Sequence, residues 1–281
     1  MKNAEQLKAI VREKYGAIAQ QSKEQNLKSC CGTGGCSTVD YSVFSDDYTH
    51  LEGYNADADL GLGCGLPTEF AKIKPGDTVV DLGSGAGNDC FVVRAIAGEK
   101  GKVIGIDMTE AMIEKARENA ARLGFKNVEF RLGDIEDMPI GGNRADVVVS
   151  NCVLNLVPDK QQAFREIFRI LKPGGHFSIS DVVIVGQLPE GLQNEAEMYA
   201  GCVSGAIQKA DYLNIVRKTG FENITVQKEK HITIPDEILL NYLDASQLEI
   251  FKNNKTGIFS ITVYADKPAT EPCCPPGNGC C

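Results

Sequence analysis

The sequence predicts an α/β fold in which a mostly parallel sheet is covered by helices on both faces. Apolar segments of strand length alternate with amphipathic segments of helix length between residues 77 and 183. A glycine-rich turn follows the first strand, and the helices open at Asn88, Thr109 and Asp159, which are residue types that favour the start of a helix. Strands and helices that alternate in this way are typical of parallel sheets with right-handed crossovers.

The elements are expected in the following order. A helix over residues 3–24 carries apolar residues at helical spacing and should pack on the domain surface. Strands are expected at residues 77–82, 102–106, 127–131, 145–150 and 176–183, with helices at 88–97, 109–123 and 159–171. Later helices are expected at 190–208 and 211–219, strands near 222–233 and 257–265, and helical or loop material at 236–254. The two late strands would complete a seven-stranded sheet.

The first strand leads into a loop with glycines at positions 83, 85 and 87, which permit a tight turn and a close approach of backbone N–H groups to a ligand. The loop contains no Lys or Arg, which excludes a triphosphate-binding loop, and its third glycine falls one position early for a dinucleotide motif. Asp107 ends the second strand about 20 residues further on, where a carboxylate can accept hydrogen bonds from ribose hydroxyls. These features favour a nucleoside cofactor without a phosphate chain. They resemble motifs I and II of class I S-adenosylmethionine methyltransferases, which implies a Rossmann-like fold.

The carboxyl ends of the parallel strands share one edge, where ligands bind. Asp134 follows the third strand and is either a contact for a purine amino group or a polar turn residue. The fourth strand ends at Asn151 and Cys152, and Cys152 should face the transferable methyl group. The residues expected to contact the cofactor are Asp81, Gly83, Ser84, Gly85, Gly87, Asn88, Asp107, Met108, Asp134, Ile135 and Asn151.

Composition excludes several classes of protein. Hydrophobic residues make up 43% of the 281 residues and charged residues 24%, as in ordinary globular proteins. A net charge of −9 without a basic block argues against a nucleic-acid partner. No apolar run approaches the ~20 residues that span a bilayer, and the N-terminus lacks the apolar region of a signal peptide. We therefore expect a cytoplasmic protein without a membrane partner.

Eleven cysteines are an unusual number for such a chain, and in a reducing compartment they indicate metal binding or catalysis. Cys64 and Cys202 have small neighbours and are expected to be accessible, whereas Cys90 lies among apolar residues and should be a buried structural thiol. Soft thiolates select soft ions, and trivalent arsenic takes three sulfurs in a pyramid with a lone pair at its apex. The remaining cysteines are Cys30, Cys31 and Cys36 in a polar loop and Cys273, Cys274, Cys280 and Cys281 in the tail.

Three cysteine-bearing segments resemble the signature segments of arsenite S-adenosylmethionine methyltransferases: residues 60–65 (LGLGCG), 150–155 (SNCVLN) and 201–206 (GCVSGA). The resemblance extends from about residue 1 to residue 265. It implies that Cys152 and Cys202 hold As(III), with Cys64 as the third ligand or as the thiol that reduces arsenic between rounds. It also implies S-adenosylmethionine as cofactor, glutathione or thioredoxin as reducing co-substrate, and a role in arsenic detoxification.

The expected organisation has four parts. Residues 1–67 supply a helix and thiol-bearing loops that cover the site, residues 68–185 form the cofactor-binding core, residues 186–268 complete the sheet and roof the arsenic site, and residues 269–281 form a flexible tail. The tail either captures dilute As(III) for delivery to the site or is an inert extension.

Two other functions stay open. One is a methyltransferase of a small organic acceptor such as a quinone precursor, although no His or Glu stands out as its base: His50 and His231 are isolated, and His176 begins a strand. The other is a non-catalytic, thiol-rich protein that binds soft metals, since a fold alone does not establish a function. Turnover of arsenite, as opposed to binding alone, distinguishes these functions. The sequence leaves open the number of methyl groups added, the activity on antimonite and the oligomeric state.

Overall fold

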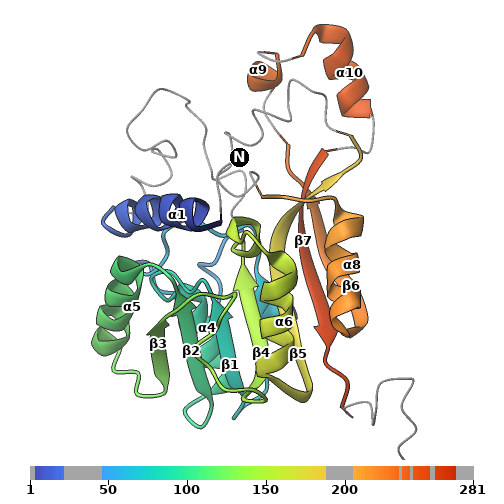
Figure 1. Ribbon diagram of the computed structural model, residues 1–281. Helices are drawn as coiled ribbons and strands as arrows, with labels where there is room; N and C mark the ends of the chain where they lie inside the picture. Colours follow the sequence, from blue (N-terminus) through green and yellow to red (C-terminus); the bar gives the residue numbers. More distant parts are fainter. Residues whose placement is uncertain are drawn as a thin grey trace, which may run out of the picture.

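The computed structural model describes residues 4–21, 46–187, 205–233, 236–240, 243–253 and 257–269. Its centre is a seven-stranded sheet in the order β3-β2-β1-β4-β5-β7-β6 (Figure 1). The strands are β1 (Thr78–Leu82), β2 (Lys102–Asp107), β3 (Val128–Leu132), β4 (Ala145–Asn151), β5 (Leu171–Val185), β6 (Glu222–His231) and β7 (Gly257–Asp266). Strand β7 is antiparallel to both of its neighbours, whereas the pairs among β1 to β5 are parallel. The predicted seven-stranded, mostly parallel sheet is therefore confirmed.

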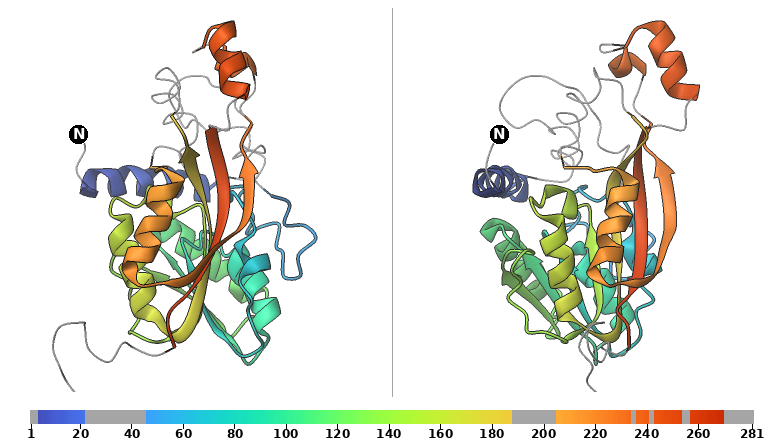
Figure 2. Two further views of the ribbon diagram at one scale, coloured as in Figure 1. Left: turned by 90° about the vertical axis from the view of Figure 1, so that its right-hand side faces the viewer. Right: turned by 45° about the vertical axis from the view of Figure 1, so that its right-hand side comes forward.

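Helices cover both faces of the sheet and bury two separate apolar clusters. They are α1 (Ala4–Ala19), α3 (Pro67–Phe70), α4 (Asn88–Ala97), α5 (Glu110–Arg122), the 3-10 turn η2 (Leu154–Leu156), α6 (Lys160–Ile170), α8 (Lys209–Thr219), α9 (Asp236–Leu239) and α10 (Ala245–Asn253). Phe91 of α4 and Met112 of α5 pack on one face. Helices α6 and α8 lie on the other face (Figure 2). There the rings of Phe164 and Tyr212 pack 5.5 Å apart. Each face therefore excludes water, as a parallel sheet requires.

Most expected boundaries are confirmed to within a few residues, whereas the N-cap of α4 and the start of β5 differ for identifiable reasons. Helix α4 begins at Asn88, but its N-cap is Gly87 rather than Asn88. Gly87 has φ +100°, a conformation that glycine adopts more readily than any other residue. Asp159, in contrast, caps α6 as predicted, because its side chain accepts a hydrogen bond from the Gln162 N–H at 2.9 Å. Strand β5 begins at Leu171 rather than at residue 176, since the irregular pairing near Ala145 accommodates the Pro-Gly-Gly segment.

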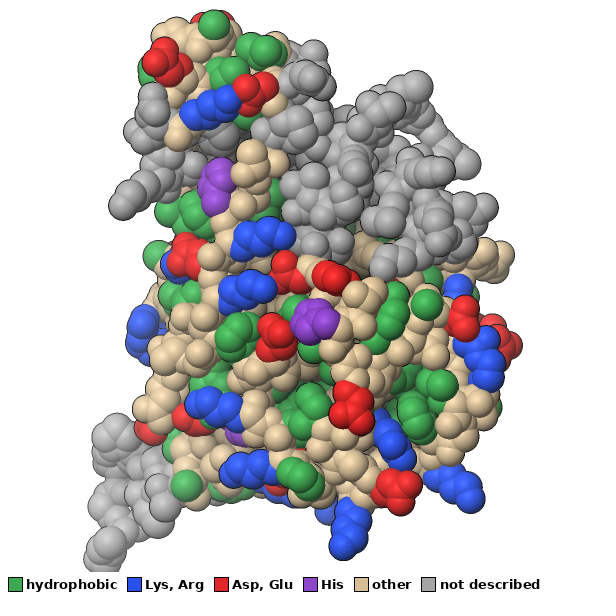
Figure 3. All heavy atoms as spheres, turned by 180° about the vertical axis from the view of Figure 1, so that it is seen from behind, with side chains coloured by type: hydrophobic (Ala, Val, Ile, Leu, Met, Phe, Trp, Pro, Cys, Tyr) green, Lys and Arg blue, Asp and Glu red, His purple; other side chains and the backbone are tan. Residues whose placement is uncertain are grey.

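The helix expected over residues 190–208 lies mostly outside the described residues, and its described end, residues 205–208, is not helical. Helices α9 and α10 project beyond the ends of β6 and β7, so they do not lie over the ends of β1 and β2 (Figure 1). On the face seen from behind, acidic and basic side chains are interspersed over the described surface (Figure 3). Within the described ranges, no helix is both long enough and apolar enough to cross a bilayer.

Candidate functional site

A pocket opens at the carboxyl ends of β1, β2 and β4, the edge where the sequence predicts the cofactor. Nine of the expected cofactor contacts line it: Gly83, Ser84, Gly85, Asn88, Asp107, Met108, Asp134, Ile135 and Asn151. Cys152 also lines it. Among the described lining residues there is no histidine.

The glycine loop is shaped for close contact with a ligand. Gly83 has φ +68° and Gly85 has φ +50°, and a Cβ atom on Gly83 would lie 2.3 Å from a methyl group of Val153. Two buried side-chain atoms in the lining, Ser84 Oγ and Asp89 Oδ1, have no hydrogen-bond partner within the described residues. Buried polar atoms without partners are rare, and here they are positioned to receive polar groups of a bound molecule.

Asp107 has its carboxylate fixed at the rim of the loop. Its Oδ2 accepts from the Gly85 N–H at 3.0 Å, and its Oδ1 accepts from the Thr109 N–H at 2.8 Å. Burial raises the pKa of Asp107, and these N–H donors oppose that shift. Each carboxylate oxygen keeps a second lone pair, so the fixed group can still accept from ribose hydroxyls.

Asp134 has partners that the sequence does not reveal. Its Oδ2 accepts from Lys8 Nζ of α1 at 2.6 Å, and its Oδ1 accepts from the Glu136 N–H at 2.9 Å. Lys8 also pairs with the Glu136 carboxylate. Helix α1, expected to pack on the domain surface and to help cover the site, contributes Lys8, Val11 and Tyr15 to the lining of the pocket.

Two expected cofactor residues, Asp81 and Gly87, lie outside the lining. The Asp81 side chain accepts from Cys90 Sγ at 3.2 Å. Burial raises the pKa of both groups well above their ordinary values, which keeps the Cys90 thiol protonated. Cys90 is fully buried, so its predicted burial is confirmed. Asp81 and Gly87 support the loop rather than line the pocket.

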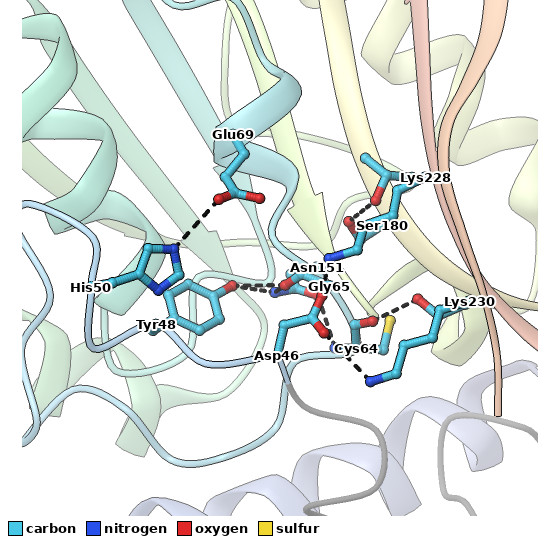
Figure 4. Close-up of polar contacts among 12 residues, drawn as sticks. Asp46, Tyr48, His50, Cys64, Gly65, Glu69, Asn151, Ser180, Lys228 and Lys230 are labelled. Atoms are coloured by element: carbon cyan, nitrogen blue, oxygen red, sulfur yellow. Dashed lines mark hydrogen bonds and ion pairs between the residues drawn. The ribbon is translucent and has the colours of Figure 1, made fainter. Parts of the chain in front are cut away.

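Asn151 joins the end of β4 to the loop that carries Cys64 (Figure 4). Its Oδ1 accepts from the Cys64 N–H at 3.1 Å, and its Nδ2 donates to the Gly65 carbonyl at 2.8 Å. The same Nδ2 donates to the Tyr48 hydroxyl, which in turn donates to Asp89 Oδ2 at 3.1 Å. One side chain therefore connects the Cys64 loop with a wall of the pocket.

Asp89 carries the acidic group of this network. Burial raises its pKa to about 6, and the hydrogen bonds from Tyr48 and Asn151 limit the rise. Asp89 is therefore mostly ionised at neutral pH. Lys8 is the one lysine among the described residues that line the pocket.

The expectation that Cys64 is accessible is wrong, because only 1% of the residue is exposed. The glycines beside it serve close packing: a Cβ on Gly65 would lie 2.6 Å from Ser180 Oγ, and one on Gly63 would lie 2.6 Å from Asn151 Nδ2. The Cys64 carbonyl also accepts from the Ser260 hydroxyl at 2.5 Å. Flanking glycines signalled a tight turn correctly, but the turn is folded inward.

Cys152 is 4% exposed and lies in the left-handed region at φ +62°, which is unusual for a residue other than glycine. Its N–H donates to the Ser180 carbonyl of β5 at 2.7 Å. Strained backbone of this kind concentrates at functional sites. The geometry ends β4 abruptly and turns Cys152 toward the pocket.

Cys202 lies outside the described residues, as do Cys30, Cys31, Cys36, Cys273, Cys274, Cys280 and Cys281. The nearest described position is Gly205, which packs so closely on Asn155 that a Cβ there would lie 1.7 Å from the Asn155 carbonyl oxygen. Gly205, three residues after Cys202 in the sequence, is therefore in contact with the turn that follows Cys152. The described residues alone contain no cluster of three potential metal ligands.

Sequence reasoning missed Tyr48, Asp89 and Lys8. Asp89 follows the glycine loop directly and is an acid in the first turn of α4, a signal that was available. Tyr48 and Lys8 reach the pocket from distant parts of the chain, and nothing in their local sequence marks them.

Comparison with known proteins finds relatives along nearly the whole chain. Residues 73–220 match a family model described as a methyltransferase domain. The arsenite methyltransferase of Halobacterium salinarum is 41% identical over 283 residues, covering 96% of this chain and 69% of the relative. The crystal structure of an arsenic(III) S-adenosylmethionine methyltransferase from Chlamydomonas reinhardtii is 33% identical with a TM-score of 0.61, covering 73% of this chain and 68% of that one. A 2-phytyl-1,4-naphtoquinone methyltransferase of Synechococcus elongatus is 33% identical over 118 residues, covering 42% of this chain and 51% of the relative.

Proposed function

Because this chain belongs to the arsenite methyltransferase family, we propose that it transfers a methyl group from S-adenosylmethionine to As(III) held by cysteine thiolates. The observation that carries this proposal is the position of Cys152, which lines the pocket and follows Asn151, the residue whose side chain accepts from the Cys64 N–H. The similarity to quinone methyltransferases covers less than half of the chain, so it supports the shared core only. Methylation of arsenite would serve arsenic detoxification.

The residues of the pocket suit S-adenosylmethionine. Asp107 would accept hydrogen bonds from the ribose hydroxyls. Asp89 Oδ1 and Ser84 Oγ have no partner within the described residues, so Asp89 would accept from the ammonium group of the methionine part and Ser84 would donate to its carboxylate. Met108 and Ile135 supply apolar surface for the adenine ring. The cofactor supplies a methyl group on a positively charged sulfur. The chain contributes mainly position, and holding reactants in a near-attack geometry can lower a barrier by several kcal/mol, about 7–11 in favourable cases.

Cys152 and Cys202 are proposed as the thiolates that hold As(III), with Cys64 as the third sulfur or the reducing thiol. A thiolate is a soft ligand that matches a soft ion, and three sulfurs leave a lone pair on arsenic free to accept the methyl group. The thiolate, not the thiol, is the ligand, so arsenic binding and thiol deprotonation should occur together. Methyl transfer leaves arsenic formally pentavalent. Two thiolates can return it to the trivalent state by forming a disulfide, and a thiol co-substrate such as glutathione or thioredoxin would then reduce that disulfide.

The test compares Cys152→Ser and Cys202→Ser with the wild type. A serine hydroxyl is a hard ligand that stays protonated at neutral pH, so each variant should lose arsenite methylation, measured as methylated arsenic by chromatography with mass spectrometry. S-adenosylmethionine affinity, measured by calorimetry, should change less than about twofold, a factor worth only ~0.4 kcal/mol.

Cys90→Ser is the matched control, since serine can still donate to Asp81 and Cys90 lies outside the pocket. It should retain arsenite methylation. Near wild-type methylation by either Cys152→Ser or Cys202→Ser would contradict the arsenic site. Binding of arsenite by the wild type without any turnover would instead identify a soft-metal binding protein.

A further inference from the structure

The Tyr48 hydroxyl connects an acid of the cofactor pocket with the loop that carries Cys64 (Figure 4). Its oxygen is 3.1 Å from Asp89 Oδ2 and 3.1 Å from the Gly65 carbonyl oxygen, so it can donate to either. A tyrosine hydroxyl has a single hydrogen, which these two acceptors must share. Asn151 Nδ2 donates to the same hydroxyl oxygen and thereby leaves that hydrogen for the two acceptors.

The ring of Tyr48 is held in place, so the hydroxyl can respond by turning its hydrogen alone. Tyr48 is 7% exposed, and its ring belongs to a small apolar cluster with Leu66 and Val92. The torsion of a hydroxyl hydrogen is free to follow the stronger acceptor. A change in the strength of either acceptor therefore redistributes the hydrogen without moving the ring.

The two oxygens of Asp89 have different surroundings. Oδ2 accepts from the Tyr48 hydroxyl and lies 3.4 Å from Asn151 Nδ2. Oδ1 is buried and has no hydrogen-bond partner within the described residues, although Asp89 lines the pocket. The proposed function assigns Oδ1 to the ammonium group of the methionine part of the cofactor. Such pairing compensates the charge that both oxygens carry, so Oδ2 becomes a weaker acceptor for Tyr48.

The loop beside Gly65 depends on a few side chains for its position. The Cys64 N–H donates to Asn151 Oδ1 at 3.1 Å, and the Cys64 carbonyl accepts from the Ser260 hydroxyl at 2.5 Å. The Gly65 carbonyl accepts from Asn151 Nδ2 at 2.8 Å and from the shared hydrogen of Tyr48. Because Tyr48 is equally distant from Gly65 and from Asp89, its bond to the loop is the contact that should strengthen most when the charge of Asp89 is compensated.

We propose that Tyr48 is a positioning residue that couples the cofactor pocket to the sulfur site: when Asp89 pairs with the ammonium group of the cofactor, the Tyr48 hydrogen turns toward the Gly65 carbonyl and fixes the loop that carries Cys64. This inference rests on the proposed function, since it concerns the same pocket and the same thiols. Coupling of this kind is reciprocal, so the cofactor and arsenite should raise each other's affinity by the same factor.

The first test needs no arsenite. Hydrogen exchange of the Cys64 amide is followed by NMR in the whole protein, with and without saturating S-adenosylhomocysteine, which has the same ammonium group and transfers no methyl. The Thr78 amide is the reference, because it also donates to a side-chain oxygen, Asp146 Oδ2 at 2.9 Å, but lies at the end of β1 away from the pocket. In the wild type, S-adenosylhomocysteine should slow exchange at Cys64 roughly fivefold relative to Thr78, the size of a modest coupling between two sites.

Two substitutions should change this exchange rate in opposite directions. Tyr48→Phe removes the hydrogen, so the Cys64 amide should exchange at least as fast as in the unliganded wild type, whether or not S-adenosylhomocysteine is bound. Asp89→Asn removes the charge that competes for the hydrogen, so the Cys64 amide should exchange slowly before any ligand is added. A merely structural role for the two residues would instead speed exchange in both variants.

Tyr264→Phe is the matched control, because Tyr264 also donates to a carboxylate, Asp266 Oδ1 at 2.6 Å, but lies outside the lining of the pocket. It should keep the wild-type response. The second test measures arsenite affinity by equilibrium dialysis with and without S-adenosylhomocysteine. The ligand should tighten arsenite binding roughly fivefold in the wild type and in Tyr264→Phe, and less than about twofold in Tyr48→Phe.

Several results would overturn the inference. They are a Cys64 amide or an arsenite affinity that S-adenosylhomocysteine leaves unchanged in the wild type, and a response in Tyr48→Phe equal to that of the wild type. Faster exchange at Cys64 in Asp89→Asn would also overturn it, which keeps the inference testable if Tyr48→Phe does not fold. If the Cys64 amide responds as expected but the wild type neither binds nor methylates arsenite, the proposed function fails and the coupling of the loop to the cofactor pocket stands.

Discussion

Asn151→Ala is expected to uncouple the Cys64 loop from β4. The substitution leaves the Cys64 N–H without its side-chain partner, and it removes one of two side-chain donors to the Gly65 carbonyl and one donor to the Tyr48 hydroxyl. Tyr48 retains its hydrogen bonds to the Gly65 carbonyl and to Asp89, so the loop is loosened rather than released. The loss should therefore appear in the positions of the thiols and much less in the cofactor pocket.

The magnitude follows from the number of groups left unpaired. A buried donor or acceptor that loses its partner costs about 1–3 kcal/mol, so the unpaired Cys64 N–H should lower the free energy of unfolding by about that amount. For a chain of this length, that corresponds to a melting temperature lower by roughly 2–5 °C. Misplacement of Cys64 relative to Cys152 should raise the half-saturating arsenite concentration at least about tenfold, a loss of ~1.4 kcal/mol.

Circular dichroism melting and arsenite titration of the methylation rate give the two quantities. Asn127→Ala is a matched control, because Asn127 also satisfies two backbone carbonyls, those of Gly98 and Gly101, at 3.0 and 2.9 Å, but lies at the opposite edge of the sheet. The control should lose comparable stability and keep its arsenite dependence. If Asn151→Ala and Asn127→Ala show the same arsenite dependence, Asn151 does not position the thiols and the reasoning is refuted.

Three further predictions concern single residues of the site. Cys64→Ser should lose arsenite methylation but still methylate methylarsenite, because methylarsenite needs only two thiolates. Analysis of the products formed from each substrate tests this. Loss of both activities would show that Cys64 is an obligatory ligand. Asp107→Ala should weaken S-adenosylmethionine binding roughly 30- to 150-fold in calorimetry, since hydrogen bonds to a charged group are worth about 2–3 kcal/mol, and unchanged affinity would place the ribose elsewhere. Lys8→Met should leave Asp134 and Glu136 as neighbouring carboxylates without their cation and weaken cofactor binding by about 1–2 kcal/mol. Unchanged cofactor affinity in Lys8→Met would show that α1 does not contribute to the cofactor site.

The sequence was sufficient for the sheet and for the position of the pocket, because both depend on local patterns. Period and length of the apolar segments predict strands and helices, and parallel strands bring their carboxyl ends to one edge. The glycine loop, Asp107 and Asn151 consequently all line the pocket as predicted. Cys90 was recognised as buried because its apolar neighbours in a helix leave it no exposed face.

The tertiary structure decided which side chains face each other across distant segments. The sequence around Cys64 indicates a tight turn, but whether that turn faces solvent or the core depends on Asn151 and Ser260, which are 87 and 196 residues away. Lys8 reaches Asp134 across 126 residues, and Asp181 meets Tyr212 across 31. Such pairs leave no periodic trace in the sequence, because they arise only when the sheet orders its strands differently from the chain. Local chemistry therefore determined what the site binds, and long-range packing determined how the binding groups are held.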